Sequence, residues 1–219
     1  MTDTPYLVPH SKEPIRILYQ DDSVLVVRKP HLLLSIPGRH PANKDCLLHR
    51  LQKDWPTAGM VHRLDLDTSG VMIIPLNKVV HAHIARQFQE RKVEKTYIAE
   101  VFGILKDDAG TIDLPIARDW PNRPQQKICF DTGKASITHY EVIKRHADRT
   151  RVLLKPVTGR THQLRLHLAA IDHPILGCDM YAHTEALGMS ERLLLHATTI
   201  SFEHPMSGED LFVECLPDF

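Results

Sequence analysis

The chain lacks closely spaced cysteines, long apolar runs and a signal-peptide core. Its four cysteines are far apart and include no Cys-x-x-Cys pair, which favours reduced thiols and predicts no zinc framework. No apolar run reaches the roughly 18 residues that a membrane span requires, and residues 1–11 contain two prolines and an acid. We therefore expect a cytoplasmic protein that has no membrane partner.

An excess of positive charge is also missing. Lys plus Arg and Asp plus Glu number 27 each, whereas nucleic-acid binders are often clearly basic. Any affinity for nucleic acid must then come from a segregated patch, and a solvated charged face is the simpler interpretation of each basic cluster. The clusters are Arg86, Arg91, Lys92 and Lys95; Arg118, Arg123, Lys127 and Lys134; and Lys144, Arg145, Arg149 and Arg151.

The 219 residues, 42% of them hydrophobic, suit one large domain or two small ones. Many strand-like segments and few helical ones predict an α+β fold with a largely antiparallel sheet. We expect a tail over residues 1–14 and one domain over 15–219, with the charged loop 106–110 as a mobile connection between two halves. Strands are predicted at 15–19, 24–27, 97–102, 137–143, 151–154, 194–202 and 211–215, and helices at 44–54 and after the capping residue Asn77.

The segment 62–70, with the sequence HRLDLDTSG, is the most informative part of the chain. Apolar runs of strand length flank it at 58–61 and 71–74, and its second half is rich in turn formers. Asp65 is therefore expected at the mouth of a sheet. A self-capping turn accounts for Asp67 and Ser69, but it does not explain Arg63 beside Asp65.

Two other kinds of site find weak support. Asp65 and Asp67 resemble the paired carboxylates of a glycoside hydrolase only in being two acids close together. A metal site among the 15 histidines is the second alternative, but His162 and His167 are five residues apart and lie on different helix faces. We expect no metal.

Segment 62–70 resembles the HRLDxxTSG signature of the RluA family of RNA pseudouridine synthases, in which the aspartate is the catalytic nucleophile. Asp65 takes that position. Four further blocks follow in the family's order and extend over most of the chain: 94–99 (EKTYIA), 158–167 (TGRTHQLRLH), 173–177 (HPILG) and 192–197 (RLLLHA).

The resemblance implies the pseudouridine synthase fold, a curved mixed sheet with flanking helices and a central cleft. Because little chain precedes the first predicted strand, we expect no separate S4 RNA-binding module of the kind that some members of the family carry. It implies isomerisation of uridine to pseudouridine in structured RNA, with no cofactor and no obligate protein partner. The glycosidic bond breaks, the base turns and it is rejoined through C5. Because the target base must leave its stack to reach a buried aspartate, base flipping is expected.

Four residues are expected around Asp65. A carboxylate in a pocket that excludes water needs a cation to stay ionised, and Arg165, at the edge of a helix after 158–159 whose buried stripe is Leu164, Leu168 and Ile171, matches the family's arginine. Tyr97 is expected to lay its ring against the base, and Arg63 to fill the place that the base vacates. By its place in the RLLLHA block, Leu195 is a candidate for the apolar wall of the base pocket, although core packing is the commoner role for a leucine.

Residues 119–127 (DWPNRPQQK) are similar to a subgroup of the family that modifies both rRNA and tRNA. This resemblance implies as targets the uridine that opens a tRNA anticodon loop and a similar hairpin loop in 23S rRNA. Arg123 and Lys127 are expected on phosphates, and Trp120 on the shape of the loop. Two alternatives stay open: another rRNA or tRNA uridine, or an RNA-binding protein that has lost catalysis.

The chain departs from the family at two places. Leu32 stands where a glycine is usual in a KPxGL element that begins at Lys29. In the segment 178–181 (CDMY), an acid usually follows the glycine directly, whereas here Cys178 does. The backbone around both positions is therefore expected to differ from the family pattern.

Overall fold

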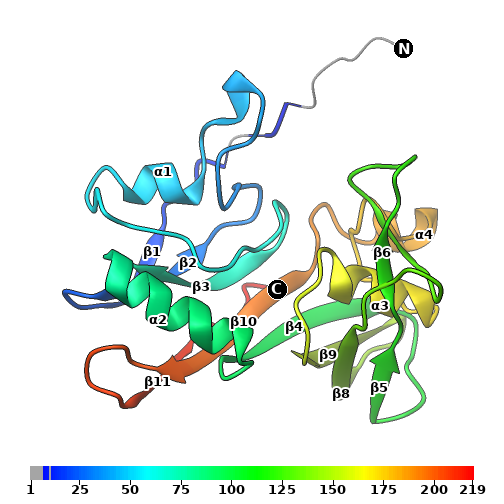
Figure 1. The fold of residues 1–219 in the computed structure, drawn as a ribbon. Coiled ribbons are helices and arrows are strands. Elements are labelled where there is room, and N and C mark those ends of the chain that lie inside the picture. Colours follow the sequence, from blue (N-terminus) through cyan, green and yellow to red (C-terminus); the bar gives the residue numbers. More distant parts are fainter. Residues whose placement is uncertain (1–6, 10) are drawn as a thin grey trace. The chain divides into compact units, whose positions relative to one another are not determined.

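The computed structural model describes residues 7–9 and 11–219, so the predicted tail lies partly outside the described residues (Figure 1). The chain divides into two compact units. Unit 1 comprises the chain up to Glu94 together with Ala197–Leu216, and unit 2 comprises Lys95–His196 with Pro217–Phe219. Strands supply most of the regular structure and the helices are few, which confirms the predicted α+β class.

Unit 1 is built on the strand order β1-β2-β3-β10, with β11 paired to β10. The β1–β2, β2–β3 and β10–β11 ladders are antiparallel, which confirms the hairpin expected at the start of the chain. Every residue of β2 and β3 is buried, because apolar side chains alternate onto both faces of these central strands. The bounds are β1 (Arg16–Gln20), β2 (Val24–Lys29), β3 (Ser69–Pro75), β10 (Leu195–Glu203) and β11 (Asp210–Glu214).

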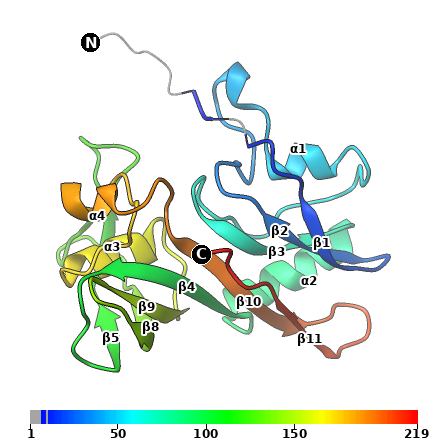
Figure 2. The same ribbon diagram turned by 180° about the vertical axis from the view of Figure 1, so that it is seen from behind.

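Helix α2 (Lys78–Gln89) covers one face of these strands, as the two opposite views show (Figures 1 and 2). Asn77 is its N-cap, and the Asn77 side chain accepts the backbone N–H of Val80 at 2.9 Å, as its sequence position predicts. Val80 and Ile84 are fully buried and pack in one cluster with Val26 and Ile73. The four-residue repeat of apolar side chains thus attaches the helix to the sheet.

The β1–β2 turn is organised by Asp21. Its carboxylate accepts the backbone N–H groups of Ser23 and Val24, each at 2.8 Å, and lies 2.8 Å from Nε2 of His204. Burial raises the pKa of Asp21, but the hydrogen bonds from Ser23 and Val24 outweigh it and lower the pKa to about 2. The ionised carboxylate is therefore part of the turn.

Unit 2 has the strand order β4-β9-β8-β5, and the three ladders in this order are antiparallel. Leu164 and Leu168 of α3 pack against Ala99, Val152 and Leu154 of β4 and β9 to form its core. A separate two-stranded hairpin joins β6 to β7. The bounds are β4 (Glu94–Phe102), β5 (Ala109–Asp113), β6 (Ile116–Arg118), β7 (Gln126–Ile128), β8 (Ile137–Arg145), β9 (Arg149–Pro156), α3 (Gln163–Ala170) and α4 (Thr184–Gly188).

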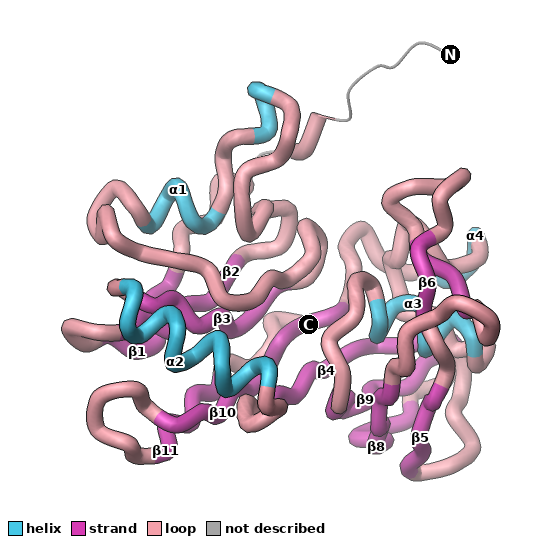
Figure 3. The backbone as a smooth tube through the Cα atoms, viewed as in Figure 1, coloured by secondary structure: helices cyan, strands magenta, loops and turns pink. Residues whose placement is uncertain are grey.

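Three local expectations were wrong. The helix predicted over 44–54 is the short α1 (Leu47–Leu51), which begins after the N-cap Cys46, whose Sγ accepts the His49 N–H at 3.4 Å, and gives way to turns over 52–54. The apolar run 58–61 is loop rather than strand, and Figure 3 draws the chain between α1 and β3 as loop. Loop 106–110 lies within unit 2 and leads into β5, so it does not connect the two units.

Candidate active site

The loop that carries Asp65 is held on both sides by unit 1. The Ser35 hydroxyl donates to the carbonyl of Leu64 at 2.7 Å and accepts the Leu64 N–H at 3.2 Å. On the other side, the ammonium of Lys29 donates to the carbonyl of Leu66 at 3.2 Å. The residues directly before and after Asp65 are therefore both anchored through their backbones.

Lys29 is fully buried, at 0% exposure, although a lysine is almost never buried without partners. Its Nζ also donates to the carbonyl oxygens of Pro30 at 2.8 Å and Leu33 at 2.7 Å. Three carbonyl dipoles thus surround the positive charge, and the ammonium joins the end of β2 to the Asp65 loop. The sequence identified Lys29 only as part of a family element and did not predict this contact, which joins residues 37 positions apart.

His62, which opens the motif, explains why the run before it is not a strand. Its Nε2 accepts the backbone N–H of Ile73 in β3 at 2.9 Å, and its ring stacks on Phe88 at 4.8 Å between centroids. The imidazole takes a donor that a neighbouring strand would otherwise use. Asp65 is half-buried and Arg63 is exposed, so the arginine side chain faces solvent.

Two residues near this loop adopt left-handed backbone. Gly70 has φ +124°, and a Cβ there would lie 2.2 Å from the carbonyl oxygen of Ala197, so only glycine fits. Leu32 has φ +55°. Glycine adopts this conformation without strain, and the expected difference from the family's backbone at Leu32 stays a prediction.

Helix α3 of unit 2 is held by a buried polar network. The Thr158 hydroxyl donates to Oε1 of Gln163 at 2.8 Å, and Nε2 of Gln163 donates to Thr138 Oγ1 at 3.0 Å. Thr138 Oγ1 lies 3.0 Å from Nδ1 of His167, whose Nε2 lies 3.0 Å from the Leu114 carbonyl. Burial lowers the pKa of His167, which favours a neutral ring that donates to that carbonyl.

Arg165 is buried rather than placed at the edge of the helix stripe, with 1% of its surface exposed. All residues from Gln163 to Leu168 are buried, because this short helix is enclosed on every side, and the edge position was wrong. The guanidinium pairs with Asp179 through Nη2 and donates from Nε to Sγ of Cys178 at 3.3 Å. These contacts use two of its five N–H donors.

Tyr97 and Leu195 belong to the hydrophobic part of unit 2. Tyr97 of β4 is partly buried and packs against the core cluster that includes Leu154, its partner across the ladder. Lys95 lies two residues before it on the same strand, and burial lowers the pKa of its ammonium. Leu195 is 3% exposed and belongs to the core cluster, so packing accounts for it, and its role in a base pocket stays a prediction.

The β6–β7 hairpin presents aromatic and cationic side chains to solvent. The guanidinium carbons of Arg118 and Arg123 each lie 4.8 Å from the centroid of the Trp120 ring, which is 59% exposed. Lys127 is exposed on β7. The sequence named Arg123, Lys127 and Trp120 as RNA contacts but placed Arg118 only in a basic cluster, and it did not predict the contact of Arg118 with the Trp120 ring.

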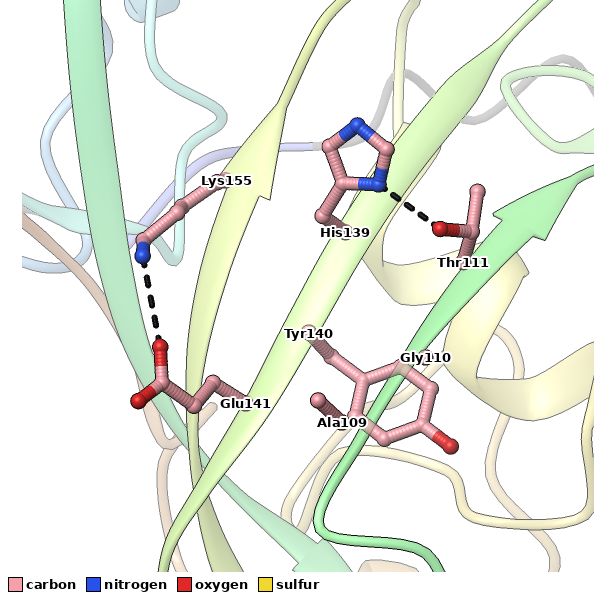
Figure 4. A pocket seen from close by; sticks show the side chains of 7 residues that line it. All are labelled: Ala109, Gly110, Thr111, His139, Tyr140, Glu141 and Lys155. Atoms are coloured by element: carbon pink, nitrogen blue, oxygen red, sulfur yellow. Dashed lines mark hydrogen bonds and ion pairs between the residues drawn. The ribbon is translucent and has the colours of Figure 1, made fainter.

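A hollow of about 390 Å³ in unit 2 contains none of the predicted site residues (Figure 4). It lies over β5, β8 and β9, where Thr111 Oγ1 lies 2.8 Å from Nδ1 of His139 and Lys155 pairs with Glu141 at 3.3 Å. The polar side chains of this hollow thus form a hydrogen bond and an ion pair with one another. Within residues 7–9 and 11–219, no three His, Cys, Asp or Glu side chains group as metal ligands, and no helix has the length and apolarity to cross a bilayer.

The predicted site residues thus fall in both units. Asp65 and Arg63 belong to unit 1, and the rest belong to unit 2. Within unit 2, Arg165 and Leu195 lie in the core, whereas Arg123 and Lys127 lie on the exposed hairpin. The expected pairing of Asp65 with Arg165 stays a prediction.

The comparisons with known proteins agree with these motifs. The family model described as RNA pseudouridylate synthase matches residues 23–170. A protein of Yersinia pestis named dual-specificity RNA pseudouridine synthase RluA is 52% identical, over 93% of this chain and 99% of that protein. The protein of the same name in Escherichia coli (strain K12) is 50% identical, over 93% of each chain.

Solved structures give the same result. The human RNA pseudouridylate synthase domain containing 1 has a TM-score of 0.79 and 31% identity, over 96% of this chain and 86% of that one. A matching family model over most of the chain and relatives of about 50% identity confirm the family resemblance that the sequence motifs indicated. The chain therefore belongs to the RNA pseudouridylate synthase family, whose members are isomerases that convert uridine to pseudouridine.

Proposed function

We propose that this enzyme acts on both rRNA and tRNA, and that its targets are uridine 746 of 23S rRNA and uridine 32 in the tRNA anticodon loop. The names of its relatives at 52% and 50% identity support dual specificity. The observation that supports an RNA hairpin loop as the substrate is the exposed cluster on the protein's β6–β7 hairpin, in which the guanidinium groups of Arg118 and Arg123 lie over the Trp120 ring.

Asp65 is the proposed nucleophile. A carboxylate attacks carbon only when it is ionised, and Arg165 is the proposed cation that keeps it so in a pocket closed by the substrate. Two features of the structure support these roles: the backbone of the Asp65 loop is anchored at Leu64 and Leu66, and the Arg165 guanidinium is held by neighbours rather than by solvent. Both groups are thus held before substrate binds.

The target base leaves its stack to reach Asp65. Tyr97 stacks on the flipped base, Leu195 contributes to the apolar wall, and Arg63 enters the gap that the base leaves. The exposure of Arg63 agrees with its role, since a side chain that enters RNA must be accessible before binding. The reaction uses no cofactor in this proposal.

The β6–β7 hairpin supplies the sequence-independent part of RNA binding. Arg123 and Lys127 contact phosphates, and the guanidinium groups that lie over the Trp120 ring offer flat cationic surfaces on which an unpaired base can stack. Such a surface suits a tightly bent loop, whose bases are unpaired and whose phosphates crowd together.

The test uses two RNA hairpins, an anticodon stem-loop and a 23S rRNA hairpin that shares its loop sequence. Tritium release from C5-labelled uridine under single-turnover conditions reports modification. Both hairpins should be modified without tRNA or ribosome context. If neither is modified while another RNA is, the dual-specificity proposal fails and only membership of the family remains.

The role of Asp65 is tested by Asp65→Asn, with Asp67→Asn as the matched control. The amide keeps the size of the side chain but is not an anionic nucleophile, so turnover should be lost and RNA binding largely kept. Asp67→Asn should keep most activity. Activity of Asp65→Asn within about tenfold of the parent would remove Asp65 from the nucleophile role, since ΔΔG‡ would then be only about 1.4 kcal/mol.

The role of the protein's β6–β7 hairpin in RNA binding is tested by Arg123→Ala combined with Lys127→Ala. Each lost phosphate contact removes counterion release, so affinity should fall and its salt dependence should flatten, while the rate on saturated enzyme stays nearly unchanged. The control combines Lys106→Ala with Lys144→Ala, two exposed cations of unit 2 outside the hairpin. An equal loss of affinity in the control would mean that general surface charge, and not the hairpin, binds the RNA.

A further inference from the structure

Tyr181 contacts three separate segments of unit 2. Its hydroxyl accepts the backbone N–H of Gln126 at 2.9 Å and lies 2.8 Å from Nδ1 of His162. Its ring lies 5.5 Å from the guanidinium carbon of Arg165. One side chain therefore touches the β6–β7 hairpin, the residue before α3 and the proposed counter-charge of Asp65.

The turn that presents Tyr181 is set by its backbone. Gly177 has φ +70°, and a Cβ there would lie 2.0 Å from the carbonyl oxygen of Arg192, so no larger residue fits. The next residues close around Arg165, since Cys178 Sγ accepts from Nε and Asp179 pairs with Nη2. The departure from the family pattern thus lies in the segment that surrounds this guanidinium, and the acid one position later still reaches it.

The hydroxyl end of Tyr181 acts at the base of the hairpin loop. Gln126 is the first residue of β7 and pairs in register with Arg118, the last residue of β6. The N–H of Gln126 can only donate, so the hydroxyl accepts there, and the tautomer of the His162 ring decides whether Nδ1 or the hydroxyl donates in their 2.8 Å contact. His162 is 8% exposed and has left-handed backbone, which places its ring beside Tyr181 instead of on the helix surface.

The ring end of Tyr181 acts on Arg165. A guanidinium near an aromatic face gains about 0.5–2 kcal/mol, more when it is removed from water. Because Arg165 is buried, loss of the ring would leave one side of the guanidinium without its neighbour. The two ends of Tyr181 therefore have separable physical roles, and a substitution can remove one and keep the other.

We infer that Tyr181 is a positioning residue that orients the RNA-binding hairpin through its hydroxyl and Arg165 through its ring. The inference rests on the proposed function, because it takes the hairpin as the RNA contact and Arg165 as the counter-charge of Asp65. Tyr181 need not touch the substrate. It fixes the base of the loop that carries Arg118, Trp120 and Arg123.

Tyr181→Phe and Tyr181→Leu separate the two ends. Tyr181→Phe removes one hydrogen bond to the hairpin and keeps the ring, so KM should rise about three- to tenfold, the equivalent of one hydrogen bond, while kcat stays within about twofold. Tyr181→Leu also removes the ring, so kcat should fall as well. The matched control is Tyr140→Phe, a partly buried tyrosine of β8 outside the hairpin and α3. The kinetics are measured on whichever RNA the parent modifies.

Amide hydrogen exchange followed by NMR gives a readout that needs no RNA. The Gln126 amide should exchange faster in Tyr181→Phe than in the parent, and Tyr140→Phe should leave it unchanged. Unchanged exchange at Gln126, a fall in kcat without a rise in KM, or identical kinetics for the Phe and Leu variants would each overturn the inference. If the parent enzyme modified neither RNA hairpin, the proposed substrates would be rejected. The exchange rate of the Gln126 amide, and the kinetics on whichever RNA the parent modifies, would still test the role of Tyr181.

Discussion

Replacement of the buried lysine by methionine, Lys29→Met, tests how the Asp65 loop is held. Methionine matches much of the length of the lysine side chain but has no ammonium. The change leaves three carbonyl oxygens, the buried ones of Pro30 and Leu33 and the partly buried one of Leu66, without the donor that they share at 2.7–3.2 Å. Because Leu66 follows Asp65 directly, the loop should lose both stability and order.

The magnitude follows from opposing terms. Three hydrogen bonds from a charged donor contribute about 1.5–3 kcal/mol each. The parent also carries the desolvation cost of a fully buried ammonium, several kcal/mol, which the methionine variant does not. Each carbonyl left without a donor costs about 1–3 kcal/mol, and after the relief of the ammonium's desolvation is subtracted we expect a net loss of about 3–5 kcal/mol. With a urea m-value of about 2–3 kcal/mol per molar, the midpoint should fall by about 1–2 M.

The assay is urea unfolding followed by circular dichroism, with Lys44→Met as the matched control. Lys44 is exposed, and its Nζ donates to one carbonyl, that of Gly38, at 2.9 Å. Its loss should cost within about 0.5 kcal/mol, as is usual at the surface. A midpoint for Lys29→Met that matches the parent and the control would refute the reasoning, since the three carbonyls would then be satisfied without the ammonium.

Three further predictions concern the site and the turns. Arg165→Met should remove several kcal/mol of transition-state stabilisation and so lower the rate. It should also move the remaining activity to higher pH, because loss of the cation favours neutral Asp65. A parent-like pH profile and rate would place Arg165 outside the site. Gly177→Ala should lower the thermal midpoint by several degrees, because its Cβ meets a backbone oxygen at 2.0 Å, whereas Gly188→Ala, with no heavy atom within 4 Å, should not; equal midpoints would contradict the clash. Because the pKa of Asp21 is lowered, its contribution to stability should be complete above about pH 4 and should be lost as the pH falls toward 2. Asp21→Asn should lower the free energy of unfolding by about 1–2 kcal/mol near neutral pH and remove this pH dependence. Urea titrations at several pH values measure both effects.

Local sequence signals predicted seven of the strands and the long helix, but not β5, β6 or β7, because the predicted elements depend on residues close in the chain. Alternating or continuous apolar runs placed β1, β2, β4, β8, β9, β10 and β11 within a few residues of their observed bounds. Asn77 caps α2 as expected, since an N-cap bond spans three residues. The run 58–61 misled the prediction because apolar composition does not reveal that the His62 side chain takes the β3 donor.

The sequence by itself determined the family and named Asp65 as the candidate nucleophile, because the motif residues are contiguous and their order along the chain is visible without a structure. Only the tertiary structure decided what holds them. The contact of Lys29 with Leu66, the pairing of Arg165 with Asp179 and the bond from Gln126 to Tyr181 join residues 37, 14 and 55 positions apart. Such contacts depend on how strands, turns and α3 pack, and a side chain's partner across that packing leaves no local pattern in the chain.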